Sequence, residues 1–212
     1  MGARFNQAMT AAADLHRGQF RKGTDIPYVS HLLGVAGIAL DYGADEDEAI
    51  AALLHDAIED APEELGADWV RRWVAFTFGG RVLAIIEACT DADRNPKPPW
   101  QARKELYVSH IAQKDASAIL VSAADKLHNA RAILADFNME GPSVFARFSA
   151  GPDAVVSYYR GLTDAFAERC ATLDERRRAR IRQLVNELER VVAAIEAASG
   201  ITGRWPYEAQ EL

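Results

Sequence analysis

The chain has 212 residues with a formal net charge of −7, and 49% of its residues are hydrophobic. This length and hydrophobic share suffice for one globular domain with a substantial core. The acidic balance argues against a broad nucleic-acid-binding face, so a polyanionic partner would need a local basic cluster or a metal ion. The sequence contains no apolar run of about 18 residues or more and no apolar secretion signal, and its two cysteines lie far apart. We therefore expect a cytoplasmic protein without a membrane-spanning segment.

The hydrophobic pattern is helical along the chain. Apolar residues recur at intervals of three and four, and no segment shows the period-two alternation of a half-buried strand. Ser30 is expected to cap the second helix, and Pro62 follows the third. We expect helices over residues 5–16, 30–41, 46–60, 67–75, 79–89, 100–113, 115–135 and 173–198, with the longer connectors at 23–27, 91–99 and 141–152.

The last expected helix is amphipathic. Its apolar residues form one stripe, while the opposite face is rich in Arg and Glu. Helical spacing alone leaves open whether this stripe packs within the chain or against another chain, so the oligomeric state stays open. We predict an all-α fold: a helical bundle over residues 1–170, with residues 171–212 as a C-terminal helical extension packed on the same domain. The stripe consists of Ile181, Leu184, Val185, Leu188, Val191, Val192 and Ile195.

The stretch LLHDAIED, residues 53–60, places four ionisable groups in an otherwise apolar segment. If the segment is helical, Glu59 follows His55 and Asp60 follows Asp56 on the same faces, one turn later. Buried charges require compensation, and imidazole nitrogen together with carboxylate oxygen suits a divalent ion such as Mn, Fe or Zn. A bland alternative is a solvated acidic helix end with His55 as a core histidine.

Two further stretches favour the metal site. The stretch IPYVSHLLGVA places His31 in the first turn of an expected helix, and VSAADKLHNARAIL places Asp125 within an apolar helical run. An unpaired carboxylate in such a run would be costly. Together with His55 and Asp56, these residues provide two imidazoles and two carboxylates from three helices, which would neutralise a divalent ion.

This order, H…HD…D, resembles that of the HD-domain metal-dependent phosphohydrolases. The motifs HRGQFRKGTDIPYVSH, ALLHDAIED, TD followed by a basic stretch, and AADKLHNAR are similar to those of the RelA/SpoT-type alarmone hydrolases, above all their small stand-alone members. The resemblance extends from about residue 8 to residue 165. It implies a single all-helical HD domain with one divalent metal ion, usually Mn²⁺. In that family the domain removes pyrophosphate from the 3′ position of guanosine tetra- and pentaphosphate.

The resemblance also implies roles for individual residues. His31, His55, Asp56 and Asp125 match the metal ligands. Glu59 and Asp60 match the pair that positions and deprotonates the attacking water. His16 opens the HRGQ motif and is expected to support the pocket. The expected substrate contacts are Arg21, Lys22, Asn129, Arg131 and Tyr159, where Tyr159 is preferred over its neighbours Tyr158 and Arg160 without a decision between them.

The chemistry is better defined than the nucleotide, because this chain has Ala130 where many alarmone hydrolases have Leu. The leading hypothesis is a metal-dependent (p)ppGpp 3′-pyrophosphohydrolase acting on a small-molecule nucleotide, with neither nucleic acid nor membrane as partner. One alternative is a phosphatase of another nucleotide, such as the 2′-phosphate of NADPH or a deoxynucleotide monophosphate. Another is a nucleotide sensor that does not hydrolyse its ligand. Glu59 and Asp60 argue against a sensor, because binding alone needs no water-activating carboxylates.

Overall fold

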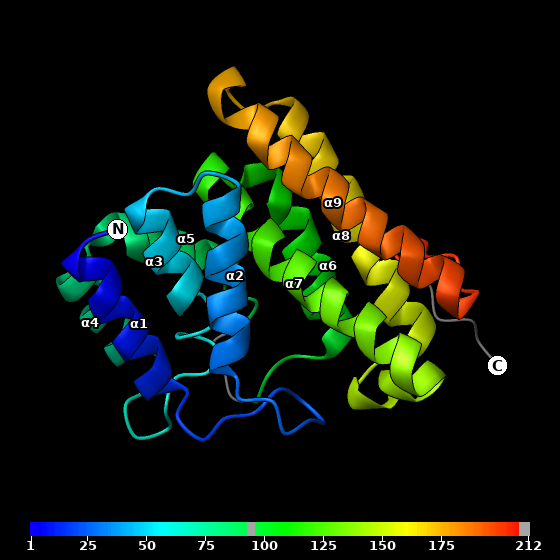
Figure 1. The fold of residues 1–212 in the computed structure, drawn as a ribbon, viewed down its shortest axis with the longest axis horizontal. Coiled ribbons are helices and arrows are strands. Elements are labelled where there is room, and N and C mark those ends of the chain that lie inside the picture. The colour runs from blue at the N-terminus through cyan, green and yellow to red at the C-terminus, as the bar shows by residue number, and fades with distance from the viewer. Residues whose placement is uncertain (93–95, 208–212) are drawn as a thin grey trace. The chain divides into compact units, whose positions relative to one another are not determined.

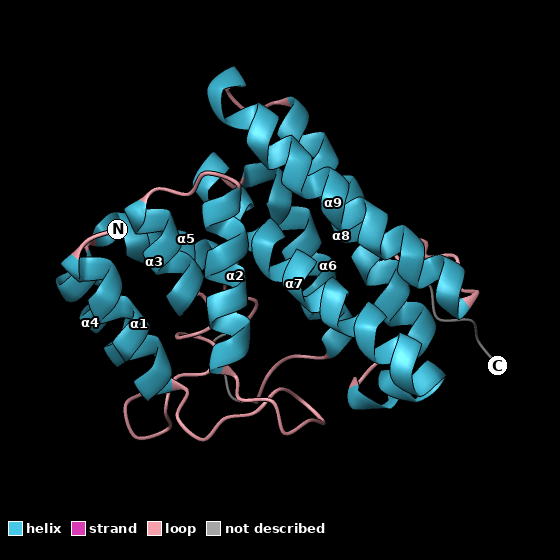
Figure 2. Cartoon of the chain, in the orientation of Figure 1, coloured by secondary structure: helices cyan, strands magenta, loops and turns pink. Residues whose placement is uncertain are grey.

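The structure is a computed structural model that describes residues 1–92 and 96–207. Within these residues the chain forms α-helices and two short 3₁₀ helices joined by loops (Figures 1 and 2). Their only extended pairing is an isolated antiparallel bridge between Phe20 and Pro27. The expected all-α fold is confirmed. The helices are α1 (Ala3–Leu15), α2 (Val29–Asp41), α3 (Glu46–Leu54), α4 (Ala67–Phe78), α5 (Gly80–Cys89), α6 (Trp100–His110), η1 (Ile111–Gln113), α7 (Ala116–Glu140), η2 (Gly141–Arg147), α8 (Pro152–Ala171) and α9 (Glu175–Ser199).

The chain divides into two compact units. The first comprises Met1–Pro98 and Lys114–Asp125, and the second comprises Pro99–Gln113 and Lys126–Leu212. Helix α7 thus contributes its N-terminal part, up to Asp125, to the first unit. Among the described helices, none has both the length and the apolar character needed to cross a membrane. The expected division of the chain at residue 170 stays a prediction. Residues 208–212 of the expected C-terminal extension lie outside the described residues.

The first unit is built around α3, whose residues from Glu48 to Leu54 are all buried. Helices α1, α2 and α5 pack against it. A capping box begins this helix: Glu48 N donates to Asp45 Oδ1 at 3.0 Å, and Asp45 N donates to Glu48 Oε2 at 2.8 Å. The other oxygen of Glu48 accepts a 2.7 Å hydrogen bond from Ser117 Oγ, and Arg81 lies 3.6 Å away. This buried carboxylate therefore links the first turns of α3, α5 and α7.

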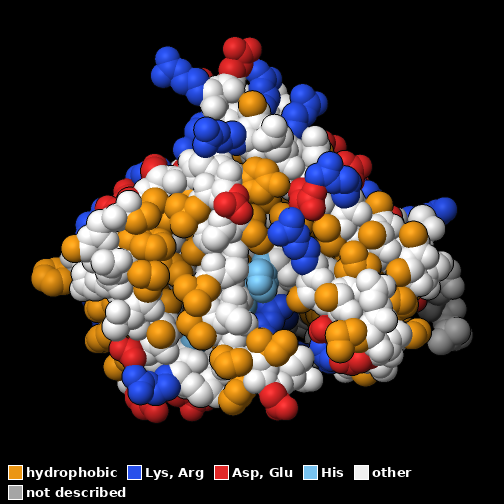
Figure 3. All heavy atoms as spheres, viewed as in Figure 1, with side chains coloured by type: hydrophobic (Ala, Val, Ile, Leu, Met, Phe, Trp, Pro, Cys, Tyr) orange, Lys and Arg blue, Asp and Glu red, His pale blue; other side chains and the backbone are white. Residues whose placement is uncertain are grey.

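The second unit is organised by the pairing of α8 with α9, which lie side by side along most of their length (Figure 1). Asp174 caps α9 by accepting a hydrogen bond from Arg176 N, and Gly200 ends it in the left-handed conformation (φ 72°). The five arginines between residues 176 and 182 belong to the first turns of α9, and Figure 3 shows basic side chains gathered at that end. Every residue of the stripe Ile181, Leu184, Val185, Leu188, Val191, Val192 and Ile195 is buried.

The segment after α9 is attached to α8 and α9 by specific contacts. Arg160 donates hydrogen bonds from Nε and Nη2 to the two carboxylate oxygens of Glu196. Glu196 Oε1 also accepts a 2.9 Å hydrogen bond from Gly203 N. Trp205 packs directly on Gly161, where a Cβ atom would lie only 2.3 Å from Trp205 Cγ. Position 161 therefore has no room for a side chain while Trp205 is in place.

Several expected helix boundaries are wrong. Helix α2 begins at Val29, one residue before the expected cap Ser30, because the Pro27 turn already supplies the first carbonyls: Ser30 N donates to Pro27 O at 3.0 Å. The third helix ends at Leu54 rather than residue 60. Helix α8 is not among the expected helix ranges, although Pro152 occupies its first turn. Its buried residues surround most of the helix, so its sequence lacks the single stripe by which an amphipathic helix is detected.

Replacement of Glu196 by Gln tests the attachment of α9 to α8. Burial alone would raise the pKa of Glu196, but the hydrogen bonds from Arg160 and Gly203 hold its pKa below the usual value. Because the folded-state pKa is lowered, the stabilisation is present above the unfolded pKa of about 4.3 and is lost as pH falls through the folded value. We expect Glu196→Gln to reduce the free energy of unfolding by about 1.5–3 kcal/mol at neutral pH.

Chemical denaturation at several pH values measures this effect. The difference between the wild type and Glu196→Gln should shrink as the pH falls below about 4. Glu189→Gln, which removes an exposed carboxylate from the same helix, is the matched control and should change stability by less than about 0.5 kcal/mol. An equal loss at all pH values would contradict the role of the ion pair.

Candidate functional site

The histidine at the end of α3 is oriented by the helix itself. His55 follows the last residue of α3, and its Nδ1 lies 2.8 Å from Ala52 O, one of the carbonyls that a helix end leaves without an internal partner. A carbonyl can only accept, so Nδ1 carries the hydrogen and Nε2 presents its lone pair in the neutral ring. This is the arrangement by which proteins commonly orient a metal-binding histidine.

The residues after His55 form turns rather than a continued helix. Ala57 N donates to Leu54 O at 2.9 Å in a tightened turn, and Asp60 N donates to Asp56 O, also at 2.9 Å. The expectation that a regular helix carries residues 55–60 is therefore wrong, although the single turn from Asp56 to Asp60 keeps helical hydrogen bonding.

Four of the expected site residues converge in the first unit. His31 comes from α2, His55 and Asp56 follow α3, and Asp125 comes from α7. His31 Nε2 lies 3.3 Å from His55 Nε2 and 3.6 Å from Asp56 Oδ2, and His55 Nε2 lies 3.0 Å from the same carboxylate oxygen. Asp125 Oδ1 lies 3.3 Å from His31 Nε2 and 3.6 Å from His55 Nε2. We call these four residues the His/Asp cluster.

The His/Asp cluster requires positive charge. Its two histidines are 1% and 2% exposed and Asp125 is 7% exposed. Burial alone would lower the pKa of His55, but the charge of Asp56 and the hydrogen bonds with both carboxylates raise it well above the usual value. Burial alone would raise the pKa of Asp56, but His55 and His31 hold it well below the usual range. A proton or a cation can supply this charge.

The donor set fits a divalent ion. His31, His55 and Asp56 each offer one ligand atom, and these three atoms lie within 4.8 Å of one another. With Asp125, two imidazole nitrogens and two carboxylate oxygens are available, a mixture that suits first-row divalent metals better than Ca²⁺ or Mg²⁺.

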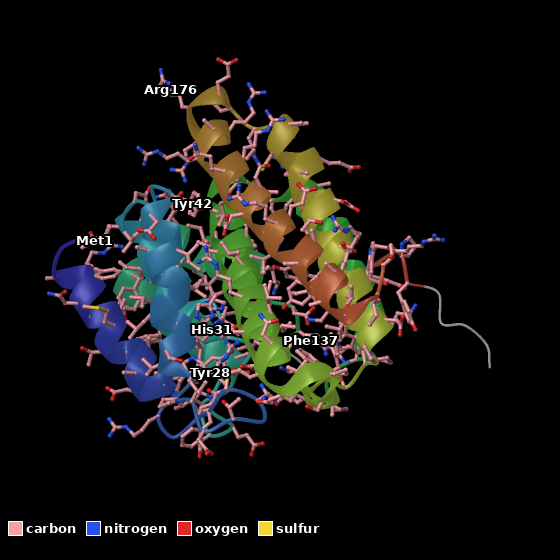
Figure 4. The ribbon with its side chains drawn as sticks, turned by 45° about the vertical axis from the view of Figure 1, so that its right-hand side comes forward. Met1, Tyr28, His31, Tyr42, Phe137 and Arg176 are labelled. Atoms are coloured by element: carbon pink, nitrogen blue, oxygen red, sulfur yellow. The ribbon has the colours of Figure 1, made fainter. Side chains whose placement is uncertain are left out.

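Tyr28 contacts the His/Asp cluster from the start of α2. Its hydroxyl donates a 2.5 Å hydrogen bond to Asp56 Oδ2. Its ring contacts two histidine rings: it stacks on His16 with centroids 5.1 Å apart and meets His31 edge-on with centroids 5.4 Å apart. Figure 4 shows Tyr28 and His31 together at one end of α2. Burial, and then the charge of Asp56, raise the pKa of Tyr28, so its hydroxyl stays protonated and is the donor.

The two expected water-activating carboxylates have separate partners. Glu59 Oε1 lies 2.8 Å from Lys97 Nζ, and Glu59 Oε2 accepts a long hydrogen bond of 3.4 Å from Asp91 N. Asp60 Oδ2 accepts a 2.9 Å hydrogen bond from Gln19 Nε2. Both carboxylates are half-buried. Gln19 and Tyr28 were not anticipated, and their only sequence signal was their place in the motif HRGQFRKGTDIPYVSH.

The expected substrate contacts fall in both units. Arg21 and Lys22 belong to the loop before α2 in the first unit, where Arg21 is half-buried and Lys22 is exposed. Asn129, Arg131 and Tyr159 belong to the second unit. Their substrate roles, like the ligand roles of the His/Asp cluster, stay predictions.

Three second-unit side chains that were considered as substrate contacts have partners within that unit. Arg131 pairs with Glu187 at 3.2 Å. Tyr159 is buried, with its ring against that of Tyr158 at 5.7 Å. Arg160, the third side chain considered for the same role, is engaged by Glu196. The guanidinium of Arg160 in α8 is therefore tied to Glu196 of α9.

Comparison with known proteins identifies the class. The sequence model of the HD domain matches residues 8–156, about two thirds of the chain. The chain therefore belongs to the HD-domain family, as the motifs indicated. HD domains bind divalent metal ions, and the His/Asp cluster is the candidate site for one.

Within this class, the relatives include alarmone hydrolases. The guanosine-3′,5′-bis(diphosphate) 3′-pyrophosphohydrolase MESH1 of Homo sapiens is 36% identical over 132 residues, which cover 61% of this chain and 69% of the relative. MESH1 of Xenopus tropicalis is 38% identical over 59% of this chain and 66% of the relative. The Haemophilus influenzae enzyme with the same pyrophosphohydrolase name is 31% identical, and the match spans only 17% of its length. The expected resemblance to the RelA/SpoT-type hydrolases is confirmed.

A solved structure supports the same assignment. A metazoan orthologue of SpoT that hydrolyses ppGpp superposes with a TM-score of 0.64 at 25% identity, over 88% of this chain and 96% of that structure. The helical arrangement is therefore shared well beyond the short motifs.

Replacement of Asp125 by Asn tests the His/Asp cluster. Loss of its carboxylate removes one expected ligand and half of the compensating negative charge. We expect the affinity for Mn²⁺ to fall by more than the 10- to 100-fold that is typical when only a group hydrogen-bonded to a ligand is lost. Isothermal titration calorimetry of the metal-stripped protein measures it. Asp41→Asn, the same change at an exposed position at the end of α2, should leave the affinity unchanged. Equal affinities in all three proteins would exclude Asp125 as a ligand.

Proposed function

We propose that this protein is a metal-dependent phosphohydrolase that removes pyrophosphate from the 3′ position of (p)ppGpp. The observation that carries the proposal is the convergence of His31, His55, Asp56 and Asp125 from three segments, with Asp60 one turn beyond Asp56. The similarity to the MESH1 proteins, whose names state this activity, supports the choice of substrate.

The reaction defines what the protein must supply. Water forms a bond to the phosphorus next to the ribose, and the bond between that phosphorus and the 3′ oxygen breaks. One proton must leave the water and one must reach the 3′ oxygen. When bound, a divalent ion supplies Lewis acidity toward a phosphoryl oxygen and lowers the pKa of water. The four residues of the His/Asp cluster would hold that ion.

Asp60 and Glu59 are proposed to handle the proton. Asp60 Oδ2 is hydrogen-bonded to Gln19, which leaves Oδ1 to accept a proton from water. Glu59 is paired with Lys97, so it is better suited to orienting water than to accepting the proton itself. The intact pair favours hydrolysis over a sensor that only binds its ligand.

The ion and the compartment belong to the same proposal. Mn²⁺ is proposed because related hydrolases usually use it and because mixed nitrogen and oxygen ligands accept it. A cytoplasmic location is proposed because both cysteines are buried and free, as is usual in a reducing compartment. The partner is a small-molecule nucleotide, and Arg21, Lys22, Asn129, Arg131 and Tyr159 remain the proposed substrate contacts.

Turnover of ppGpp is the first test. Protein loaded with Mn²⁺ should release pyrophosphate from ppGpp and form GDP, which anion-exchange chromatography resolves. A parallel panel contains NADPH and deoxynucleotide monophosphates. Release of phosphate from one of these without cleavage of ppGpp would establish the alternative phosphatase. Binding of ppGpp without turnover by any substrate would establish a sensor.

Conservative replacement of the carboxylate pair tests its role in the reaction. Asp60→Asn should lower kcat by about 10²- to 10⁴-fold, the range typical of a positioned general base, and Glu59→Gln should lower it less. The Mn²⁺ content, measured by elemental analysis, should be unchanged in both. Glu64→Gln, an exposed acid shortly after the pair, is the matched control. An unchanged kcat in Asp60→Asn would contradict the assignment.

Arg21→Ala tests the proposed substrate grip. Arg21 lies two positions after Gln19, which contacts Asp60, so its loop is anchored next to the proposed reacting centre. Removal of one cationic contact to phosphate should raise KM about tenfold, since a charge-assisted hydrogen bond contributes about 1.5 kcal/mol. Arg17→Ala, which removes an arginine that is 80% exposed, should leave KM unchanged. Equal KM values for both variants would remove Arg21 from the substrate site.

A further inference from the structure

The loop between α1 and α2 is closed by backbone pairing. Tyr28 N donates to Gln19 O at 2.9 Å, and Arg21 N donates to Ile26 O at 2.8 Å, on either side of the Phe20–Pro27 bridge. Gly23 makes the return possible, because its φ of 73° lies in the region that favours glycine. Gln19 and Tyr28 are therefore opposite each other at the base of the loop.

Each of these two residues holds one aspartate of the site. Tyr28 donates to Asp56, and Gln19 donates to Asp60. The two aspartates are themselves joined by the backbone hydrogen bond from Asp60 N to Asp56 O. The base of the loop thus contacts both carboxylates of the turn from Asp56 to Asp60: Tyr28 contacts the first and Gln19 contacts the second.

His16 joins the two contacts. It is 4% exposed at the end of α1, and its ring stacks on Tyr28 with an interplanar angle of 22°. Its Nδ1 lies 2.6 Å from Gln19 Oε1. Since Gln19 uses its amide nitrogen for Asp60, its oxygen accepts from His16, and Nδ1 carries the hydrogen. Its Nε2 has no hydrogen-bond partner among the described residues, so the ring is oriented by Gln19 and Tyr28.

We propose that His16, Gln19 and Tyr28 form a positioning layer that sets the Asp56 carboxylate for metal binding and the Asp60 carboxylate for proton transfer. The Asp60 half of this inference rests on the proposed function. The Asp56 half rests only on metal binding by the His/Asp cluster.

The physical reason is the freedom of a carboxylate to rotate. A hydrogen bond to one oxygen selects one orientation of the group and so the direction in which its lone pairs point. Tyr28 and His55 both approach Asp56 Oδ2, at 2.5 and 3.0 Å, so this oxygen faces the centre of the cluster with its orientation fixed. Gln19 orients Asp60 in the same way.

The metal arm of the test uses Tyr28→Phe, which removes the hydroxyl and keeps the ring that stacks on His16. The affinity for Mn²⁺, measured by calorimetry, should fall 10- to 100-fold. Tyr42→Phe is the matched control, because Tyr42 is half-buried at the opposite end of α2 (Figure 4). Unchanged affinity in Tyr28→Phe, or an equal loss in Tyr42→Phe, would overturn this arm.

The catalytic arm uses Gln19→Met, which keeps the length of the side chain and removes both hydrogen bonds. Turnover of ppGpp should show a kcat about tenfold lower, a part of the 10²- to 10⁴-fold attributed to the base itself. KM and Mn²⁺ affinity should be unchanged, which a purely structural role would not produce. Gln7→Met, at an exposed position of α1, is the control. An unchanged kcat would overturn this arm.

His16→Phe distinguishes the two contacts of the shared residue. Phenylalanine keeps the stack on Tyr28 and loses the hydrogen bond to Gln19. The variant should therefore resemble Gln19→Met, with lower kcat and unchanged Mn²⁺ affinity. A loss of affinity without a change in kcat would contradict the proposed connection.

The two arms remain decisive if the proposed function fails. Mn²⁺ affinity requires no substrate, so Tyr28→Phe is informative even if the wild type cleaves no ppGpp. In that case crystal structures of the Mn²⁺-loaded wild type and Gln19→Met decide the second arm: the Asp60 carboxylate should rotate in the variant, and an unchanged orientation would overturn the role of Gln19. Gln19→Asn, which keeps the amide on a shorter side chain, replaces the Met variant if that variant does not fold.

Discussion

The first unit depends on holding two imidazoles and two carboxylates together in its interior, with imidazole nitrogens 3.0–3.6 Å from carboxylate oxygens. Removing carboxylates from water is costly, and the cost is offset only when positive charge and hydrogen bonds replace the lost hydration. The ionisable groups come from three separate segments of the chain. Correct packing of α2, α3 and α7 and the chemistry of the site are therefore a single requirement.

Several interactions outside the His/Asp cluster meet this requirement. Glu48 links the beginning of α3, the helix that His55 follows, to the beginning of α7, the helix that contains Asp125, through Ser117. At the other end of α3, the Ala52 carbonyl orients the His55 ring. Apolar residues fill the intervening core of α3. Stability and ligand geometry in this unit thus arise from the same short helix.

Much of the site could be predicted because ionisable residues in apolar runs are rare without a partner. This applied to His55, Asp56 and Asp125, and the place of His31 in the first turn of an expected helix completed the set. The contacts of Gln19 with Asp60 and of Tyr28 with Asp56 could not be predicted. They depend on the backbone hydrogen bond between Tyr28 and Gln19 that closes the loop, and no sequence pattern indicates that bond. The end of α3 at Leu54 was missed because the apolar spacing continues through Ile58, while the backbone tightens into turns. Helix α8 lacked a single apolar stripe because it is covered on most sides.

The contact between Gly161 and Trp205 has a consequence for comparing this chain with its relatives. The indole ring of Trp205 packs against the backbone of Gly161, so any residue larger than glycine at position 161 would displace the ring. The residues at positions 161 and 205 therefore depend on each other. Joint variation at these two positions would therefore trace which homologues share this C-terminal segment. A substitution at 161 alone would signal a different path for the end of the polypeptide.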